Sequence, residues 1–322
     1  MLLGGLLAVF SAAFHGTNNA CLRRGVLTGS VPQALAVTIT IGVPLTFLAA
    51  FLSGQLFRVG ELSLQQIAFV SAAGILQYVW GRFWGYSATR LIGAVGAGPI
   101  NQSQMWIAVT LAVVFLGESV TWLKLVGMLL IFTAPFIIAL ALRQKRKENT
   151  AIHKLLTEQG QTSAAESLFI PKIWLGYGCA LLAAMGYGIA PVLVRSGVGD
   201  AGLGLNGVMF AYLSAFFTFW LIAFIVPRQL HEIKTLERQA GRWYVFSGLL
   251  TFSGQVCYFL ALSIAPVTVV APLFQLSMIA RVVASYLINP KHEVLSTAAL
   301  LAIAVSFAGT LAISIDMVLN SS

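Results

Sequence analysis

The chain has 322 residues, of which 58% are hydrophobic and only 9% are charged. Soluble domains carry roughly 25% charged residues, so this composition excludes an ordinary soluble protein and indicates an integral membrane protein. The formal net charge of +9 is interpreted as basic loops facing anionic lipid head groups, and no nucleic-acid partner is expected. The three cysteines, Cys21, Cys179 and Cys257, are far apart and match neither a disulfide framework nor a zinc motif.

Long, continuous apolar runs predict an all-α membrane protein, because a bilayer core about 30 Å thick requires about 20 apolar residues per helix. Strands of a membrane β-barrel would instead show short alternating segments. Division of the sequence at its charges and polar loops predicts ten transmembrane helices: 2–22, 33–53, 67–89, 94–116, 122–142, 173–194, 205–226, 243–264, 267–288 and 295–315.

The first predicted span is read as a retained helix, because Met1 leads into apolar residues without the basic region of a signal peptide. His15 lies within this span and is followed by Asn18 and Asn19. Histidine titrates near neutral pH, so these three residues are candidates for proton coupling. The alternative is that they only form hydrogen bonds with neighbouring helices.

The third predicted span contains Arg82. A guanidinium at mid-membrane costs at least about 2.5 kcal/mol, so such a residue usually faces a protein interior or a water-filled cavity. Helical spacing places Tyr78 on the same stripe as Arg82, and Trp80 and Trp84 on roughly the opposite side. Arg82 is therefore a candidate substrate-binding residue. The alternative is a structural arginine that is satisfied by helix-end carbonyls or snorkels to the cytoplasmic side.

Polar side chains also occur near prolines in the fourth and ninth predicted spans. Asn101 and Gln104 share a helix face, and Gln275 follows Pro272 by three residues. Proline frees a backbone carbonyl, and broken helices form the sites of many transporters. We therefore predict that Asn101, Gln104 and Gln275 contact a polar substrate, with hydrogen bonding between helices as the alternative.

A second arginine, Arg281, lies well inside the ninth predicted span, and Ser277 shares its helix face. All ten acidic residues fall in loops or at span ends, so no carboxylate is expected at mid-membrane. Two buried guanidinium groups without a carboxylate favour a substrate that carries a carboxylate or phosphate. Aromatic candidates for the wall of the substrate site, with packing or the interface belt as their more usual role, are Tyr78, Tyr258, Trp80 and Trp84.

A polar, basic linker at 143–172 divides the chain into two five-helix repeats, 1–142 and 173–316. An odd number of spans per repeat makes the second copy enter the membrane from the opposite side, so the repeats are predicted to be inverted. This alignment places Leu262 opposite Arg82. The aligned pairs are Gly16–Gly188 and Arg23–Arg195 at an offset of 172, Gly74–Gly254 and Tyr78–Tyr258 at 180, and Asn101–Gln275 at 174.

Three stretches carry a resemblance to a known family: SAAFHGTNNACLRRG, AAMGYGIAPVLVRSG and LAVVFLGESVTWLKLVGMLLIFTA. With them the chain resembles the ten-span EamA-type members of the drug/metabolite transporter superfamily over nearly its whole length. The resemblance implies a central cavity lined by the first, third and fourth spans of each half, and transport of small organic solutes. It also implies a helix-end structural role for Glu118 and Glu293, although the second half lacks the Gly-Glu pair of the first.

The distribution of basic residues predicts the orientation in the membrane. The odd-numbered loops hold 14 of the 19 Lys and Arg residues, and the even-numbered loops hold 3. Under the positive-inside rule, the odd-numbered loops are cytoplasmic and both termini face outward. The expected location is the inner (plasma) membrane, crossed many times.

The sequence thus predicts a secondary active transporter that moves a small anionic or zwitterionic metabolite by alternating access, with proton coupling as an open option. No catalytic constellation, phosphate-binding motif or metal cluster is recognised, so neither an enzyme nor a cofactor is expected. The expected partners are the small-molecule substrate and membrane lipids, with a homodimer left open. The alternatives are a flippase for lipids or other amphipaths, and a non-transporting scaffold or sensor subunit.

Overall fold

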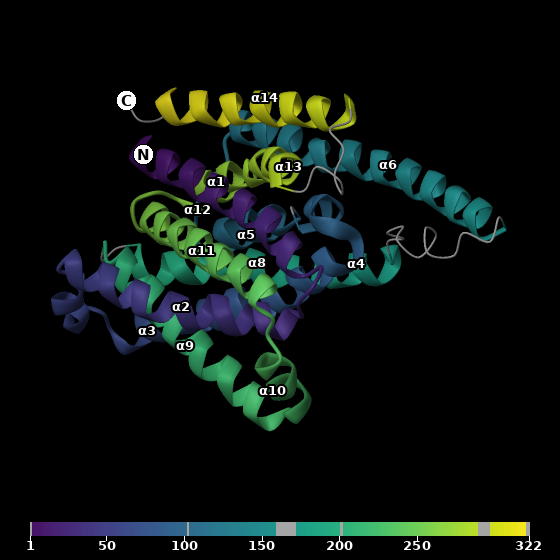
Figure 1. Cartoon of the computed structure of the whole chain (residues 1–322). Helices are drawn as coiled ribbons and strands as arrows, with labels where there is room; N and C mark the ends of the chain where they lie inside the picture. The colour runs from purple at the N-terminus through teal and green to yellow at the C-terminus, as the bar shows by residue number, and fades with distance from the viewer. Residues whose placement is uncertain (1, 102, 159–171, 200–201, 289–296, 320–322) are drawn as a thin grey trace.

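The computed structural model describes residues 2–101, 103–158, 172–199, 202–288 and 297–319. These described residues contain helices and no strand, which confirms the all-α prediction (Figure 1). The elements in chain order are α1 (Leu2–Gly25), α2 (Val31–Leu52), η1 (Gln55–Glu61), α3 (Leu64–Gly74), η2 (Ile75–Gly81), α4 (Arg82–Asn101), α5 (Gln104–Leu116), α6 (Trp122–Glu158), α8 (Ile173–Val198), α9 (Gly204–Ile225), α10 (Pro227–Lys234), α11 (Arg238–Ile264), α12 (Val267–Phe274), α13 (Ser277–Ile288) and α14 (Thr297–Leu319).

Local sequence signals explain where several helices begin. Ser30 and Gln33 form a reciprocal capping box at the start of α2, and Ser63 and Gln66 form another at the start of α3. Among the described residues, five helical segments are long and apolar enough to cross a membrane: Val31–Leu52, Ile173–Val198, Gly204–Ile225, Arg238–Ile264 and Val267–Ile288.

The predicted third and fourth spans differ from the observed helices. The third span consists of α3, the π-helical segment η2 and the first part of α4. A positive φ of 81° at Gly93 interrupts α4, as only glycine readily permits, and the predicted fourth span begins after it. The predicted linker is also partly regular, because α6 continues as one helix of 37 residues to Glu158.

The fourth and ninth predicted spans break at corresponding positions. In the first half, α4 ends at Asn101 and α5 begins at Gln104. In the second half, α12 ends at Phe274 and α13 begins at Ser277. At each break the backbone N–H groups bond to carbonyls three residues back, as Ser103 does to Ile100 and Gln275 does to Pro272, both at 3.0 Å. Both breaks lie beside polar side chains.

The helices of the two halves pack in an exchanged pattern. α1 packs against α11 and α13, and α8 packs correspondingly against α3, α4 and α5. α2 pairs with its counterpart α9, and α6 pairs with its counterpart α14. The first helix of each half therefore lies mainly against helices of the other half.

Glycine contacts correct the repeat alignment in the third span. A Cβ atom on Gly81 would lie 2.6 Å from Cε1 of the Tyr187 ring, and one on Gly254 would lie 2.5 Å from Cε1 of the His15 ring. Since His15 and Tyr187 correspond at an offset of 172, Gly254 corresponds to Gly81 at 173, and the predicted match to Gly74 is wrong. Gly74 and Gly81 are seven residues apart, a spacing that would share one face of a regular α-helix, so the sequence could not distinguish the two registers. In the structure the π-helical η2 lies between them, and Gly74 faces α9 whereas Gly81 faces α8.

Two arginines confirm this register. Arg23 Nη1 donates to the carbonyl of Thr89 at 3.1 Å, and Arg195 Nη1 donates to the carbonyl of Leu262 at 3.0 Å. Thr89 and Leu262 are again separated by 173 residues. The counterpart of Arg82 is therefore Gln255, and the predicted counterpart Leu262 is wrong.

Glu118 links the two halves of the chain by hydrogen bonds at the start of α12. Its two carboxylate oxygens accept hydrogen bonds from the backbone N–H groups of Val267 at 2.9 Å and Thr268 at 2.8 Å. These N–H groups begin α12 and have no partner within the helix, so Glu118 caps it. This agrees with the predicted helix-end role of Glu118, whereas Glu293 lies outside the described residues.

A second link joins α6 to α14. Thr121 Oγ1 donates to Asp316 Oδ1 at 2.6 Å, and Lys124 Nζ lies 3.7 Å from Asp316 Oδ2. Both charged residues are buried, at 9% and 3% exposure, so the ion pair lies within the helix interface.

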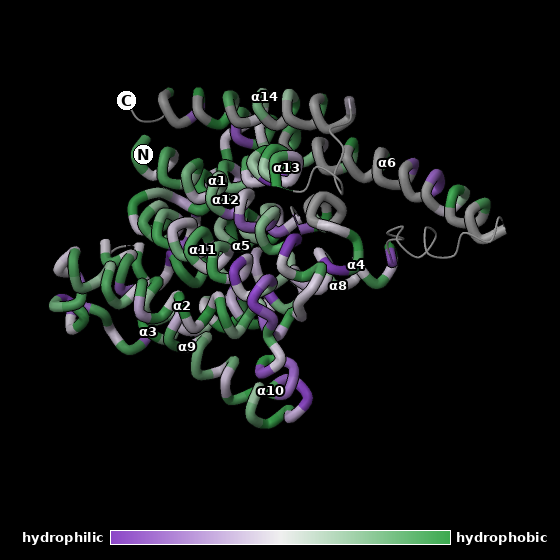
Figure 2. The backbone as a smooth tube through the Cα atoms, viewed as in Figure 1, coloured by the Kyte–Doolittle hydropathy of each residue, from purple (hydrophilic) through white to green (hydrophobic). Residues whose placement is uncertain are grey.

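The beginning of α1 and the end of α14 lie at the same end of the bundle, and the end of α6 projects from the opposite end (Figure 1). Hydrophilic residues gather in α10 and at the end of α6, whereas hydrophobic residues cover much of the remaining helix surface (Figure 2). The bundle therefore has a polar end remote from both described termini.

Gly16→Ala is expected to lower the thermal unfolding temperature of the purified protein by several degrees. The new Cβ would lie 2.5 Å from Ala280 Cβ and 2.6 Å from the Arg281 backbone nitrogen, and overpacking of this kind costs about 1–3 kcal/mol. Gly178→Ala is the control, because nothing lies within 4 Å of the added atom there. Equal unfolding temperatures for the two variants in detergent would contradict the close packing of α1 on α13.

Glu118→Gln is expected to destabilise the protein by about 0.5–2 kcal/mol, the usual range for loss of a helix cap. The amide keeps one acceptor for α12 but replaces the other with a donor that faces a backbone N–H. Thermal unfolding of the variant beside Glu61→Gln, a surface control in η1, measures the difference. Identical unfolding temperatures for these two variants would exclude a stabilising cap.

Candidate functional site

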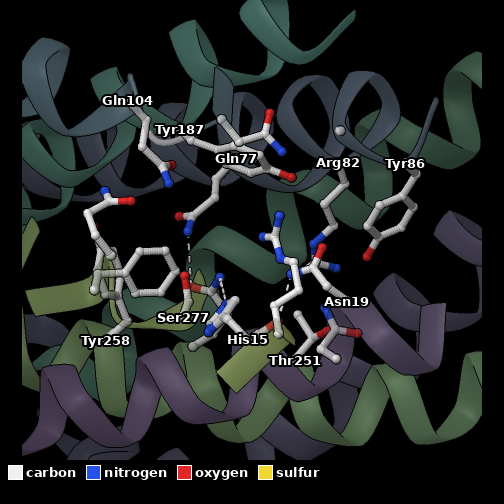
Figure 3. A pocket seen from close by; sticks show the side chains of 17 residues that line it. His15, Asn19, Gln77, Arg82, Tyr86, Gln104, Tyr187, Thr251, Tyr258 and Ser277 are labelled. Carbon is white, nitrogen blue, oxygen red and sulfur yellow. Dashed lines mark hydrogen bonds between the residues drawn. The ribbon is translucent and has the colours of Figure 1, made fainter. Parts of the chain in front are cut away.

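A cavity lies where α1, η2, α4, α5, α8, α11, α12 and α13 meet (Figure 3). Its volume is about 70 Å³, which holds a few water molecules and is smaller than typical sites for organic ligands. No Asp or Glu is among its described lining residues, which are His15, Asn18, Asn19, Gln77, Arg82, Gly85, Tyr86, Asn101, Gln104, Tyr187, Thr251, Gln255, Tyr258, Phe274, Gln275, Ser277 and Arg281.

Arg82 is the first residue of α4, directly after the π-helical segment η2, and only 3% of it is exposed. Its Nη2 donates to the Tyr212 hydroxyl at 3.0 Å, and its Cζ lies 4.4 Å from the Tyr78 ring centroid and 5.4 Å from that of Tyr212. The two rings stabilise the cation by cation–π attraction. The buried Nη1 forms no hydrogen bond to any described residue, which leaves one donor group of the guanidinium for a ligand or water.

His15 and Gln255 form a hydrogen-bonded pair on the other side of the cavity. His15 Nε2 lies 2.9 Å from Gln255 Nε2, and His15 Nδ1 lies 2.9 Å from the carbonyl of Ser11. Gln255 Oε1 accepts hydrogen bonds from the Tyr78 hydroxyl at 3.1 Å and from Gln77 Nε2 at 3.2 Å. Tyr78 therefore lies between the Gln255 amide and the Arg82 guanidinium.

The two helix breaks bring further polar groups to the cavity. Asn101 closes α4 and Gln104 opens α5, while Gln275 lies at the second break and Ser277 opens α13. Arg281 lies one turn beyond Ser277 and is 7% exposed. The breaks thus position amide and hydroxyl groups from both halves around the same space.

Asn18 and Asn19 complete the polar wall on α1. Asn18 Oδ1 accepts a short hydrogen bond of 2.5 Å from Ser247 Oγ, and Asn19 Nδ2 donates to the carbonyl of His15 at 2.7 Å. Ten of the predicted site residues line the cavity: His15, Asn18, Asn19, Arg82, Asn101, Gln104, Tyr258, Gln275, Ser277 and Arg281.

The remaining predicted site residues lie elsewhere. Tyr78 is fully buried beneath Arg82 and supports its guanidinium from behind the cavity wall. Trp80 is 43% exposed and donates from Nε1 to the carbonyl of Leu182 at 2.9 Å, and Trp84 packs against it with ring centroids 5.9 Å apart. Neither tryptophan is among the described lining residues, because both lie on the helix face away from the Arg82 stripe.

Sequence reasoning missed several lining residues, above all Gln77, Tyr187, Thr251 and Gln255. Gln255 corresponds to Arg82 and Tyr187 corresponds to His15 in the corrected repeat alignment. An offset of 173 in the third span would have identified Gln255, and the offset of 172 already found in the first span pairs Tyr187 with His15.

The comparisons with known proteins agree with this architecture. The family model described as the EamA-like transporter family matches residues 2–140 and 174–315, one match in each half of the chain. The search of curated proteins found no match. Among solved structures, 26 chains match.

One of these solved structures, described only as "Crystal structure of protein", is 16% identical and has a TM-score of 0.66. The match covers 97% of this chain and 98% of that chain, and it supports the fold alone. The family model, by contrast, covers most of both halves. The chain therefore belongs to the EamA-like transporter family, within the drug/metabolite transporter superfamily.

Proposed function

We propose that the chain is a ten-span secondary transporter of the inner membrane that moves a small anionic or zwitterionic metabolite by alternating access. Family membership establishes a membrane transporter of the drug/metabolite type, and the substrate class and mechanism are our proposal. In this proposal, residues 1–142 and 173–316 are inverted five-helix repeats joined by the segment 143–172. The exchanged helix packing of the two halves supports this arrangement.

The observation that carries the substrate class is the buried charge of Arg82. A buried charge is costly unless it is paired, and no described lining residue of the cavity is Asp or Glu. Tyr78 and Tyr212 lie against the guanidinium and leave Nη1 without a hydrogen bond to a described residue. A substrate carboxylate or phosphate would complete this site by charge-assisted hydrogen bonding.

Acceptor groups beside Arg82 support a substrate that also carries donors. Asn101 Oδ1 and Gln77 Oε1 are buried and form no hydrogen bond to a described residue. An ammonium or hydroxyl group on an anionic substrate would satisfy such oxygens. Arg281 adds positive charge to the same cavity, and Gln104 and Gln275 supply further amides for orientation.

The size of the cavity requires movement during transport. A volume of about 70 Å³ is too small for an organic metabolite, so the helices around it must separate to admit one. The breaks between α4 and α5 and between α12 and α13 supply places where the backbone can bend. In this proposal the cavity opens first to one side of the membrane and then to the other, as alternating access requires.

Arg82→Gln is expected to weaken binding of small carboxylates and phosphates by about 10- to 100-fold, the range for loss of a charged hydrogen bond of about 1.5–3 kcal/mol. The measurement is thermal stabilisation of the purified protein by malate, glutamate, glycerol 3-phosphate and inorganic phosphate. Arg58→Gln is the matched control, because Arg58 is exposed in η1 and pairs only with the neighbouring Glu61 among described residues.

Equal stabilisation of the wild type and Arg82→Gln by these anions would overturn the anionic site. Stabilisation by phospholipids alone would support the flippase alternative. Stabilisation by neither class would support a scaffold or sensor subunit.

Both termini are expected to face outward, because the basic odd-numbered loops favour the cytoplasm. A phosphatase fused to the C-terminus, which is active only outside the cytoplasm, is expected to be active. A fluorescent protein that matures only in the cytoplasm is expected to remain dark at the same position. The opposite pair of results would reverse the proposed orientation.

A further inference from the structure

The hydrogen bonds of His15 define its protonation state in this structure. The carbonyl of Ser11 can only accept a hydrogen bond, so His15 Nδ1, 2.9 Å away, carries the proton. His15 Nε2 then holds a lone pair and accepts from the Gln255 Nε2 amide at 2.9 Å. His15 is therefore a neutral imidazole, with its open nitrogen directed at Gln255.

The same Gln255 amide is held from its other end. Its oxygen accepts from the Tyr78 hydroxyl at 3.1 Å and from Gln77 Nε2 at 3.2 Å, and Gln255 is only 3% exposed. A proton added to His15 Nε2 would point at the Gln255 NH₂ group, so two donors would face each other. A half-turn of the amide removes this conflict by presenting its oxygen to His15.

The surroundings provide partners for the turned amide. Gln77 Oε1 is buried and forms no hydrogen bond to a described residue, so rotation of Gln77 would let it accept from the turned NH₂ group. The Tyr78 oxygen has lone pairs that can accept as well. Both orientations of Gln255 can therefore be satisfied, and each corresponds to one protonation state of His15.

The charges around His15 couple its protonation to the anion site. The titratable groups that face the cavity are Arg82 and Tyr86 from α4, Arg281 from α13, Tyr258 from α11 and Tyr187 from α8, and Tyr78 lies behind its wall on η2. No described lining residue carries a negative charge, so protonated His15 would add a third positive charge beside Arg82 and Arg281. An anion in the cavity offsets that charge, and linkage makes the effect reciprocal.

The repeat alignment relates the anion site to the His15–Gln255 pair. Gln255 corresponds to Arg82, and His15 corresponds to Tyr187, so the two halves present related pairs to one cavity. The first-half position in the third span holds a permanent cation, whereas the second-half position holds a neutral amide beside a titratable imidazole. We therefore expect Arg82 to bind the anion and the pair of His15 and Gln255 to take up the proton.

We propose that Gln255 is a two-position amide switch through which His15 takes up one proton from water together with an anion at Arg82. Gln255 is a positioning residue in this scheme, because it acts through His15 and Tyr78. The proposal rests on the proposed function, since it assumes that the cavity accepts an anion. It adds the residue that links the anion to a coupling proton.

The first test measures the tautomer of the His15 imidazole. Long-range ¹H–¹⁵N correlation spectra of the full-length, histidine-labelled protein distinguish the two neutral tautomers, and loss of one signal set in His15→Gln assigns His15 among the four histidines. We expect the Nδ1–H tautomer in the wild type and in Gln239→Met, an exposed control on α11. Gln255→Met is expected to keep the Nδ1–H tautomer, because the Ser11 carbonyl still accepts from Nδ1 in that variant. A wild type in the Nε2–H form would overturn the switch.

The second test measures how the affinity for an anion depends on pH. The apparent Kd of malate or inorganic phosphate, measured by thermal stabilisation, is expected to rise up to about tenfold per pH unit where one proton must be taken up. Gln255→Met is expected to flatten this slope. Gln77→Met is the second variant: it leaves the bond between His15 and Gln255 in place, so the wild-type tautomer is expected together with a reduced slope.

The outcomes separate the two proposals. Arg82-dependent anion binding with equal pH slopes in the wild type and both glutamine variants overturns the switch and leaves the proposed function standing. Absence of anion binding to the wild type overturns both. Flattened slopes in both variants, with the Nδ1–H tautomer in the wild type, support the switch.

Discussion

The centre of this protein depends on how a guanidinium group is kept away from water without a carboxylate. Arg82 is held by two tyrosine rings and one tyrosine hydroxyl, all of them neutral groups. These contacts stabilise the cation but leave its charge uncompensated by any described lining residue. The polar amides, the broken helices and the glycines that permit close helix packing all surround this charge, and the proposed substrate class follows from it.

The sequence was sufficient for the helical character and the two-part organisation, because long apolar runs and the basic segment after residue 142 are visible without tertiary information. Buried polar residues were also found, since Arg82, Arg281, Asn101 and Gln275 are conspicuous in apolar surroundings. The third predicted span does not coincide with a single regular α-helix, and the backbone changes direction at Gly93, just before the fourth. Neither the π-helical segment before Arg82 nor the left-handed Gly93 has a hydropathy signal, so both were missed.

Two of the site residues that escaped prediction are related to predicted ones by the repeat. Gln255 and Tyr187 are ordinary polar residues in sequence, and only their correspondence to Arg82 and His15 points to the cavity. The match of Gln255 depends on which glycine faces which ring, and glycines seven residues apart look equivalent in sequence. Trp80 and Trp84 were predicted at the site but are not among the described lining residues. Helical spacing shows that they share a side, but not whether lipid or protein covers that side.

The cap that Glu118 forms on α12 binds a helix of the second repeat to the first repeat. α12 is encoded by the second repeat, yet its first N–H groups are bound by a carboxylate of the first repeat, and it packs against α1 and α5. A rocking movement that preserves these bonds would carry α12 with the first repeat, together with α13, which also packs against α1. The rigid bodies of transport would then be composite, with helices of one sequence half moving with the other half.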